Sequence, residues 1–356
     1  MTSSLRAALV GYGLGGSAFH APFLASTPGL VLGAVVTGNP ERQTAARDRY
    51  PGTEVIGSLD ELLTRADEFD LAVVTTPNRH HAANATALLE HGLPVVVDKP
   101  FAASLDDARA LRETARSRNL MLAPFHNRRY DGDFLTVQRL LNEGRLGRAL
   151  RFESRFERWR PDASVNRKEW KENADPANAG GITFDLGSHL IDQAVVLFGR
   201  PTHVHAEVLV RRETALVDDD VFIALTHDNG VRSHLWMSAI AADLGPRFRV
   251  LGDKAYYVKY GLDPQENALR AGEIPGGPGW GEEPESEWGR VGADRQSTVE
   301  RTDPGAYQQF WSGIVTALRT NTPPPVTADD GVTVLEVIEA AYRAQASGRQ
   351  EIPPVG

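Results

Sequence analysis

Short apolar runs alternate with amphipathic segments in the first third of the chain. Strands are expected at residues 7–10, 30–36, 71–75, 94–97 and 120–123, and helices at 58–66, 80–91 and 105–118. Strands that are covered by helices on both faces are apolar on both sides, so these short uninterrupted runs predict a parallel sheet between two helix layers. Residues 1–124 are therefore predicted to form a doubly wound α/β domain.

Longer segments of alternating apolar and polar residues replace this pattern after Pro124. Strands are expected at 149–158, 203–212, 221–227, 231–239, 248–251 and 255–259, and helices at 133–142, 181–198, 303–319 and 328–346. Alternation predicts strands with one buried face, and Asp228-Asn229-Gly230 has the composition of a hairpin turn. Residues 125–356 are therefore predicted to form an α+β domain with a large open, mostly antiparallel sheet, and 272–292 a surface loop.

Composition narrows the class of protein. The chain has 356 residues, 41% of them apolar and 24% charged, which is typical of a globular protein with a sizeable core. The net charge of -9 without a basic cluster argues against a nucleic-acid partner, and the absence of cysteine excludes disulfides and thiolate metal sites. Apolar stretches stay below the roughly 20 residues that span a bilayer. A soluble, cytoplasmic protein without a membrane partner is expected.

A glycine-rich turn follows the first expected strand and opens the first helix. In Gly-x-Gly-x-x-Gly turns the first glycine permits a tight turn, the second lets a pyrophosphate approach the backbone, and the third packs helix on strand. The helix N-terminus adds unpaired N–H groups that favour phosphate. The pattern predicts a Rossmann-type dinucleotide site at this turn, made by Gly11, Gly13, Leu14, Gly15 and Gly16.

The end of the second expected strand bears on the choice of cofactor. NAD sites usually place a carboxylate there, about 20 residues after the glycine turn, to bind the ribose 2′-hydroxyl. This chain instead has Thr37, Asn39 and, shortly after, Arg42. A hydroxyl, an amide and a guanidinium favour a 2′-phosphate, so we expect NADP rather than NAD, although NAD is retained as an alternative. The other interpretation of Arg42 is a solvated helix residue.

A charged pair follows the strand expected at 94–97. Asp98 and Lys99 precede Pro100 at the carboxyl end of a central strand, where open α/β sheets bind their ligands. The alternative is an ordinary surface turn.

A second constellation lies in the helix expected at 181–198. Asp185, His189 and Asp192 are spaced i, i+4 and i+7 and share one helix face. Gly187 within that helix costs roughly 1 kcal/mol relative to alanine, which indicates a close approach to the backbone, for example by a nicotinamide ring. The alternative is that His189 is a buried core histidine with Asp192 on its solvent side.

Hydride chemistry explains why these residue types would meet. When hydride leaves an alcohol carbon for a nicotinamide, the hydroxyl proton must leave as well, and His189 has the near-neutral pKa suited to carry it. Lys99 can bind the same oxygen and stabilise its developing negative charge. Asp185 would bind substrate hydroxyls or orient the other two groups. No metal is expected, because no pair such as His-x-x-x-His supports one.

Several stretches together resemble a known family. They are the glycine turn with Gly16-Ser17-Ala18-Phe19-His20-Ala21-Pro22, Thr75-Thr76-Pro77-Asn78-x-x-His81, Asp98-Lys99-Pro100, and the helix with Asp185, Gly187 and His189. In this order they resemble the Gfo/Idh/MocA oxidoreductases. The stretches 126–136, 185–193 and 259–263 resemble the NADP-dependent scyllo-inositol dehydrogenase branch of that family.

The resemblance implies roles for individual residues. Lys99, Asp185 and His189 would be catalytic and would also bind substrate, together with Arg128 and Trp159. Further cofactor contacts would come from Thr76, Pro77, Asn78, His81, Asp98, Lys99 and Asn127. Trp170 belongs to the same polar-aromatic stretch as Trp159, with no role assigned. The family usually has Glu where this chain has Asp98, a departure that is expected to tune cofactor binding. The open sheet of the family implies a homodimer or homotetramer.

The combined prediction is an NADP(H)-dependent oxidoreductase that transfers hydride to or from a CH–OH group of a cyclitol or sugar. An aldose or ketosugar reductase of the same family is one alternative. A non-catalytic dinucleotide-sensing regulator is another, because the fold also serves regulators, but a sensor has no need of a lysine and a histidine for proton chemistry.

Overall fold

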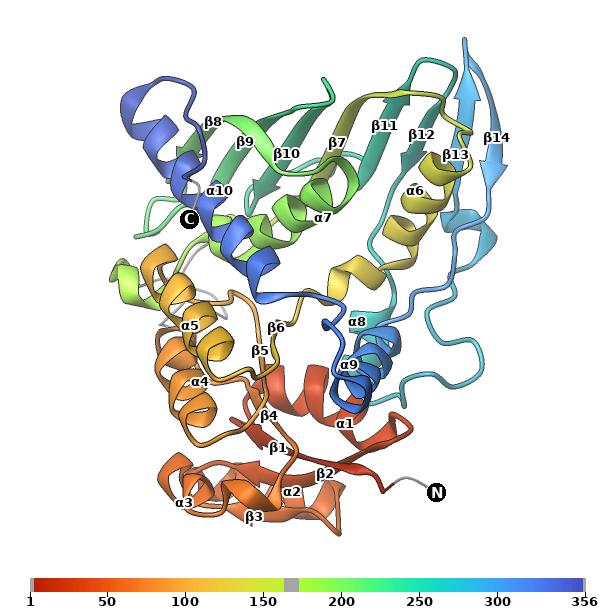
Figure 1. The fold of residues 1–356 in the computed structure, drawn as a ribbon. Coiled ribbons are helices and arrows are strands. Elements are labelled where there is room, and N and C mark those ends of the chain that lie inside the picture. The colour runs from red at the N-terminus through yellow and green to blue at the C-terminus, as the bar shows by residue number, and fades with distance from the viewer. Residues whose placement is uncertain (1–2, 163–172, 355–356) are drawn as a thin grey trace. The chain divides into compact units, whose positions relative to one another are not determined.

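Figure 1 shows the computed structural model of the chain, which describes residues 3–162 and 173–354. Trp170 lies outside the described residues. The chain divides into two compact units, each assembled from segments that are distant in the sequence. Unit 1 comprises Met1–Asn127, Gln265–Trp280 and Ala306–Val332, and unit 2 comprises Arg128–Pro264, Gly281–Gly305 and Thr333–Gly356.

A six-stranded parallel sheet forms the centre of unit 1. Its strands are β1 (Leu5–Val10), β2 (Leu30–Val36), β3 (Glu54–Ile56), β4 (Leu71–Val74), β5 (Val95–Val97) and β6 (Leu122–Pro124). Their order is β3-β2-β1-β4-β5-β6, so the order reverses between β1 and β4. This confirms the predicted doubly wound sheet. The three-residue edge strand β3 was not predicted, because it is too short to show a pattern.

Helices cover both faces of this sheet. They are α1 (Ala21–Ser26), α2 (Pro40–Arg49), α3 (Leu59–Leu63), α4 (His81–Glu90), α5 (Leu105–Ser117), α8 (Gln265–Ala271) and α9 (Gln308–Thr320). In Figure 1, α4 and α5 lie on one side of the sheet, whereas α1 and α9 lie on the other. The segment 272–292 was expected to be a surface loop throughout, and this is wrong at Trp280. Trp280 is 9% exposed and packs edge-on against Phe23, because burial stabilises its large apolar ring.

Unit 2 contains an eight-stranded sheet. Its strands are β7 (Ala149–Glu157), β8 (Pro201–Leu209), β9 (Asp220–His227), β10 (Arg232–Ser238), β11 (Phe248–Gly252), β12 (Tyr256–Lys259), β13 (Gly289–Ala293) and β14 (Gln296–Glu300). In the order β14-β13-β12-β11-β7-β10-β9-β8, only β7 and β10 are parallel neighbours among the described strands. The mostly antiparallel sheet is confirmed. The β13–β14 hairpin was missed because glycines and exposed polar residues dominate it.

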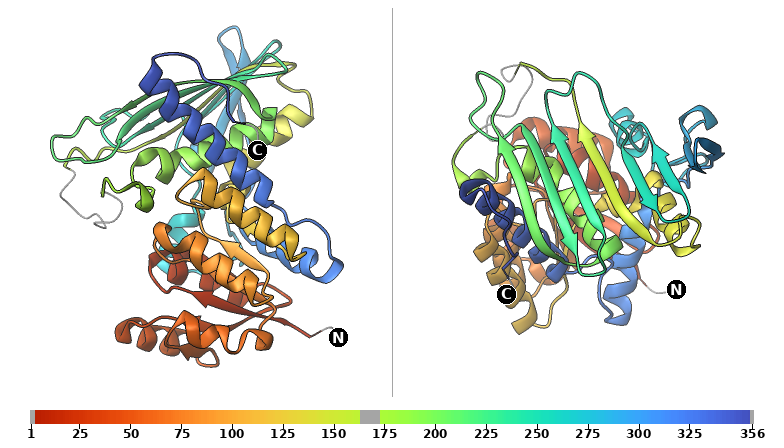
Figure 2. Two further views of the ribbon diagram at one scale, coloured as in Figure 1. Left: turned by 60° about the vertical axis from the view of Figure 1, so that its left-hand side comes forward. Right: turned by 90° about the horizontal axis from the view of Figure 1, so that it is seen from above.

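Helices lie on one face of this sheet. They are α6 (Gly132–Asn142), α7 (Ser188–Phe198) and α10 (Ala328–Ser347), which begins in unit 1. On β9, Val221, Ile223 and Leu225 are buried while the alternate residues are half-buried, as one covered face requires. The right-hand view of Figure 2 shows the strands toward the viewer and the helices behind them. Among the described residues, no helix is long and apolar enough to cross a membrane.

Candidate active site

The glycine turn leaves β1 where the strand order reverses, which is where open α/β sheets bind their ligands. Gly11 has a φ of +101°, and its carbonyl oxygen accepts a hydrogen bond of 2.8 Å from Thr75 Oγ1 at the end of β4. A Cβ added to Gly16 would lie 2.2 Å from that same oxygen, so only glycine fits there. A Cβ added to Gly13 meets nothing within 4 Å, so the backbone there is open to close approach by a pyrophosphate.

The helix after the turn begins with a widened, π-helical turn, Gly15–His20. The N–H of Ala21 donates to the carbonyl of Gly16, five residues earlier. Leu14, just before this turn, is 42% exposed. A Cβ added to Gly15 would lie 2.9 Å from Asp98 Oδ2, so the glycine turn and the end of β5 are in close contact. Single π-helical turns are frequent at functional sites, in accordance with the cofactor role predicted here.

The end of β2 shows a structural role that sequence reasoning missed. Asn39 caps α2, because its Oδ1 accepts a hydrogen bond of 3.0 Å from the backbone N–H of Arg42. Thr37 is buried, and the Arg42 side chain is exposed on the first turn of α2. An asparagine followed by proline at a helix start was the available signal for this cap. The guanidinium of Arg42 is thus a solvent-facing group at a helix N-terminus.

Asp98 follows β5 and is held by its neighbours. Its Oδ1 accepts a hydrogen bond of 2.8 Å from the backbone N–H of Lys99 and lies 3.6 Å from Nε2 of His20. His20, from the π-helical turn, is fully buried, and its ring lies 4.2 Å from that of Phe125. The sequence motif contained His20, but only the fold shows that it faces the carboxylate beside Lys99.

The pKa of Asp98 is lowered from 3.8 to about 2. Burial acts in the opposite direction and raises it, but the interactions with His20 and, after it, with His81 and Lys99 outweigh burial. Asp98 is therefore a carboxylate at neutral pH, fixed between the glycine turn and the lysine.

His81 joins two turns of unit 1. Its Nε2 lies 2.8 Å from the carbonyl oxygen of Thr76, and its Nδ1 lies 2.8 Å from that of Pro100. The ring is 1% exposed, and burial lowers its pKa, although Asp98 and the two carbonyls oppose this effect. The predicted cofactor loop and the lysine turn are thus connected through one histidine. Asn78, beside this loop, is buried.

We expect the charge on Asp98 to stabilise the folded protein in a pH-dependent way. Because the folded pKa is below the unfolded value, the stabilisation is present above pH 4 and is lost as the pH falls toward 2. A shift of this size corresponds to about 2 kcal/mol. Asp98→Asn should lower the free energy of unfolding by about that amount at pH 7 and by much less at pH 2, measured by urea titration.

The exposed Asp106→Asn on α5 removes the same charge and serves as the control. An equal loss for Asp98→Asn at both pH values would contradict the assignment.

Asp185 and His189 lie in unit 2, on the helical segment that packs against β10. Asp185 is half-buried and His189 is 5% exposed. The expected continuous α-helix is instead a π-helical turn, Thr183–Gly187, followed by α7, because the N–H of Ser188 donates to Thr183 O five residues earlier. Asp192 is 2% exposed, which excludes the solvent-side placement considered above.

Gly187 has a packing explanation in this unit. A Cβ at this position would lie 3.3 Å from Cε of Met237 on β10 and 3.7 Å from Cγ2 of Thr183. The distance to Met237 is tight for a methyl group, whereas the distance to Thr183 is an ordinary van der Waals contact, so the glycine lets the helix pack closely on β10. The proposed close approach of a nicotinamide ring stays a prediction.

Three further residues were predicted to belong to the site. Asn127 and Arg128 follow β6, and Trp159 follows β7. Asn127 is 7% exposed and ends the first segment of unit 1. Arg128 begins unit 2 and is 3% exposed, with its Nη1 3.1 Å from Asp131 Oδ2. Trp159 is 57% exposed, just beyond β7. Burial gives Arg128 a clear structural role, and its predicted substrate contact stays a prediction.

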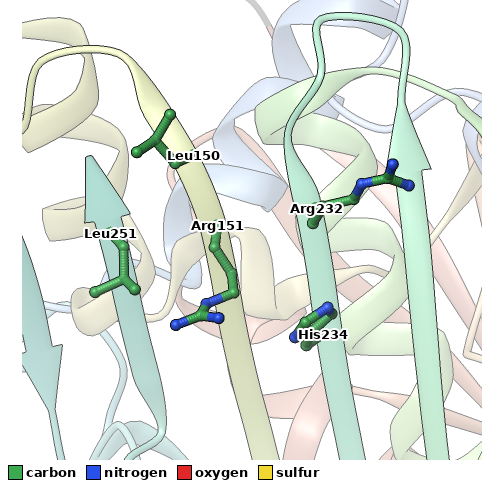
Figure 3. A pocket seen from close by; sticks show the side chains of 5 residues that line it. All are labelled: Leu150, Arg151, Arg232, His234 and Leu251. Atoms are coloured by element: carbon green, nitrogen blue, oxygen red, sulfur yellow. The ribbon is translucent and has the colours of Figure 1, made fainter. Parts of the chain in front are cut away.

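Figure 3 shows a pocket of unit 2 that contains none of the predicted site residues. It has a volume of about 380 Å³ and is lined by Leu150, Arg151, Arg232, His234 and Leu251. These residues come from β7, β10 and β11. Among the described residues, no cluster of His, Asp or Glu could hold a metal ion.

A parallel sheet with a glycine turn at its reversal point, followed in the chain by a unit with an open sheet, is the architecture of a Rossmann-type dinucleotide-binding protein. Residues 5–126 match the NAD-binding Rossmann fold of an oxidoreductase family, and residues 138–354 match the C-terminal alpha/beta domain of that family. The chain belongs to the Gfo/Idh/MocA oxidoreductase family, as its motifs predicted.

Individual relatives agree with this assignment. The scyllo-inositol 2-dehydrogenase (NADP(+)) IolW of Bacillus subtilis is 33% identical over 351 residues, which cover 97% of this chain and 95% of the relative. D-apiose dehydrogenase of Paraburkholderia graminis is 26% identical, covering 90% of this chain and 82% of the relative. The solved structure of the oxidoreductase yvaA from Bacillus subtilis has a TM-score of 0.91 at 30% identity and covers 98% of each chain.

Proposed function

We propose that the chain transfers hydride between NADP(H) and a CH–OH carbon of a cyclitol or sugar. The observation that carries this proposal is the glycine turn, whose Gly13 is open while its Gly16 touches Gly11, at the reversal point of the sheet. These residues fit a dinucleotide, because close backbone approach at Gly13 is what a pyrophosphate needs. When bound, the nicotinamide would accept or donate the hydride.

The protein's own groups would bind the alcohol and move its proton. Lys99 would donate a hydrogen bond from Nζ to the reacting oxygen and stabilise negative charge there. His189 would take the hydroxyl proton on a ring nitrogen during oxidation and return it during reduction. Asp185 would bind a neighbouring hydroxyl and fix the substrate. That Lys99 of unit 1 and the pair from unit 2 act on one substrate is part of this proposal.

The relatives support the substrate class. One is named for scyllo-inositol and another for D-apiose, so both a cyclitol and a sugar belong in the assay. Absorbance at 340 nm with NADP or NAD, measured against a panel of inositols, aldoses and ketoses, tests the proposal. Turnover of at least one polyol or sugar is expected. No turnover, together with cofactor binding that His189→Ala leaves unchanged, would instead favour a dinucleotide-sensing regulator.

Cofactor choice makes a separate prediction. Arg42→Ala should weaken NADP binding by about 10- to 100-fold, because a charge-assisted hydrogen bond to the 2′-phosphate is worth roughly 1.5–3 kcal/mol. NAD lacks that phosphate, so its Kd should stay unchanged. Fluorescence titration with both nucleotides measures the two constants. Arg47→Ala, which removes an exposed arginine from the last turn of α2, is the control. Equal losses for NADP and NAD would refute the assignment of Arg42.

We further propose that the open face of the unit 2 sheet joins copies of the chain into a homodimer or homotetramer. Arg151 and Arg232 are opposite each other in the strand register at one end of this face, and Glu157 and Asp220 are opposite Ser238 at the other. A twofold axis that reverses the strand direction would place the basic end of one copy over the acidic end of the next. Light scattering at two salt concentrations measures the molar mass of the assembly and therefore the number of copies that it contains.

A further inference from the structure

A two-armed ion pair holds α7 one turn beyond His189. Nε of Arg129 lies 2.9 Å from Asp192 Oδ2, and its Nη2 lies 2.6 Å from Asp192 Oδ1. The side chains of Arg129 and Asp192 are 13% and 2% exposed. This planar, bidentate geometry fixes direction as well as distance, because both guanidinium arms must meet both carboxylate oxygens.

The next residue of α7 strengthens this attachment. Nε2 of Gln193 donates to the carbonyl oxygen of Arg128 at 2.8 Å. Oε1 of Gln193 accepts from Nη2 of Arg247 at 2.7 Å, and Nη1 of Arg247 donates to Ser154 Oγ on β7 at 2.6 Å. The segment at 128–129 therefore holds both Asp192 and Gln193, and the sheet holds Gln193 through Arg247, so the rotation of the helix about its own axis is fixed there.

The other end of the segment is held separately. Oδ2 of Asp218 accepts hydrogen bonds of 2.7 Å from both the backbone N–H and the hydroxyl of Thr183. The hydroxyl of Tyr342 donates to Asp218 Oδ1 at 2.8 Å. Asp185 and His189 thus lie between two anchored ends of one segment that contains a π-helical turn.

We infer that Arg129 is a positioning residue for the reaction, which acts through Asp192 to set the orientation of His189. The inference rests on the proposed role of His189 as proton carrier. A proton passes only over hydrogen-bonding distance, so a small rotation of α7 would separate the ring from the alcohol, and a misplacement of about 1 Å can cost 10²-fold in rate. A mere stabiliser of unit 2 would change the melting temperature without this specific loss.

Arg129→Lys tests the inference, because it keeps the charge but cannot bind both carboxylate oxygens. We expect kcat to fall by about 10- to 100-fold, with KM and the NADP Kd unchanged and a larger solvent deuterium isotope effect. Arg139→Lys on α6 is the matched control: its guanidinium also bridges two carboxylates, Asp303 at 2.9 Å and Glu300 at 3.1 Å. That control should keep the wild-type kcat.

A second readout does not depend on turnover. The imidazole resonance of His189, assigned by its loss in His189→Ala, should shift in Arg129→Lys and stay in place in Arg139→Lys. If Arg129→Lys fails to fold, Asp192→Asn, which keeps the shape of the side chain, replaces it in both measurements.

The outcomes separate the two proposals. If Arg129→Lys matches Arg139→Lys in kcat and in the His189 resonance, the inference is overturned while the proposed function stands. If wild-type protein turns over no polyol or sugar, the proposed function fails. If His189→Ala keeps full activity, the proposed role of His189 as proton carrier fails. The resonance comparison then still decides whether Arg129 positions His189.

Discussion

Gly16→Ala is expected to destabilise the protein itself, even without cofactor. Its Cβ would lie 2.2 Å from the carbonyl oxygen of Gly11 and 2.8 Å from Thr75 Oγ1, and the first of these atoms belongs to the backbone. The helix would have to move away from β1, at a cost at or above the upper end of the roughly 1–3 kcal/mol that overpacking causes. We expect the melting temperature to fall by roughly 5–10 °C, measured by circular dichroism.

Gly13→Ala is the matched control for this experiment. It adds the same methyl group where nothing lies within 4 Å, so the melting temperature without cofactor should stay near that of wild type. The methyl group would occupy the space that a pyrophosphate needs, so NADP and NAD should both bind at least about 10-fold more weakly. A wild-type melting temperature for Gly16→Ala, or wild-type cofactor binding for Gly13→Ala, would contradict our account of the turn.

His189→Ala is expected to have the largest effect on catalysis. Loss of a general acid–base group typically costs about 10²–10⁴-fold in rate. Because the ring moves a proton in the transition state, kcat should carry this loss, while the NADP Kd changes little. Steady-state rates at 340 nm and fluorescence titration measure these quantities.

His203→Ala removes an exposed histidine from β8 and should leave kcat unchanged. Equal kcat values for the His189 and His203 variants would remove His189 from the proposed mechanism.

The sequence was most informative where a pattern repeats or where only one residue type fits. Short apolar runs predicted the parallel sheet, since a strand buried on both faces cannot include polar residues. The glycine turn was recognisable because Gly11 needs a positive φ and Gly16 has no room for a Cβ. The edge strands β3 and β14 were missed, because half-exposed residues carry little pattern.

Individual contacts across long sequence separations could not be predicted. Arg129 and Asp192 are 63 residues apart, and Thr183 and Asp218 are 35 residues apart. Each of these residues alone has the appearance of an ordinary charged or polar side chain. The pairing follows from which strands and helices pack together, and that depends on the whole core.

The sequence alone therefore determined the class of fold and the family, because local spacing and residue type carry this information. It also predicted the chemistry of Lys99, Asp185 and His189. Only the tertiary structure decided how these groups are supported. It placed His20 beside Asp98, set His81 between Thr76 and Pro100, and buried Asp192 against Arg129. The physical reason is that a buried charge or imidazole requires partners, and folding brings those partners from segments that are not neighbours in the chain.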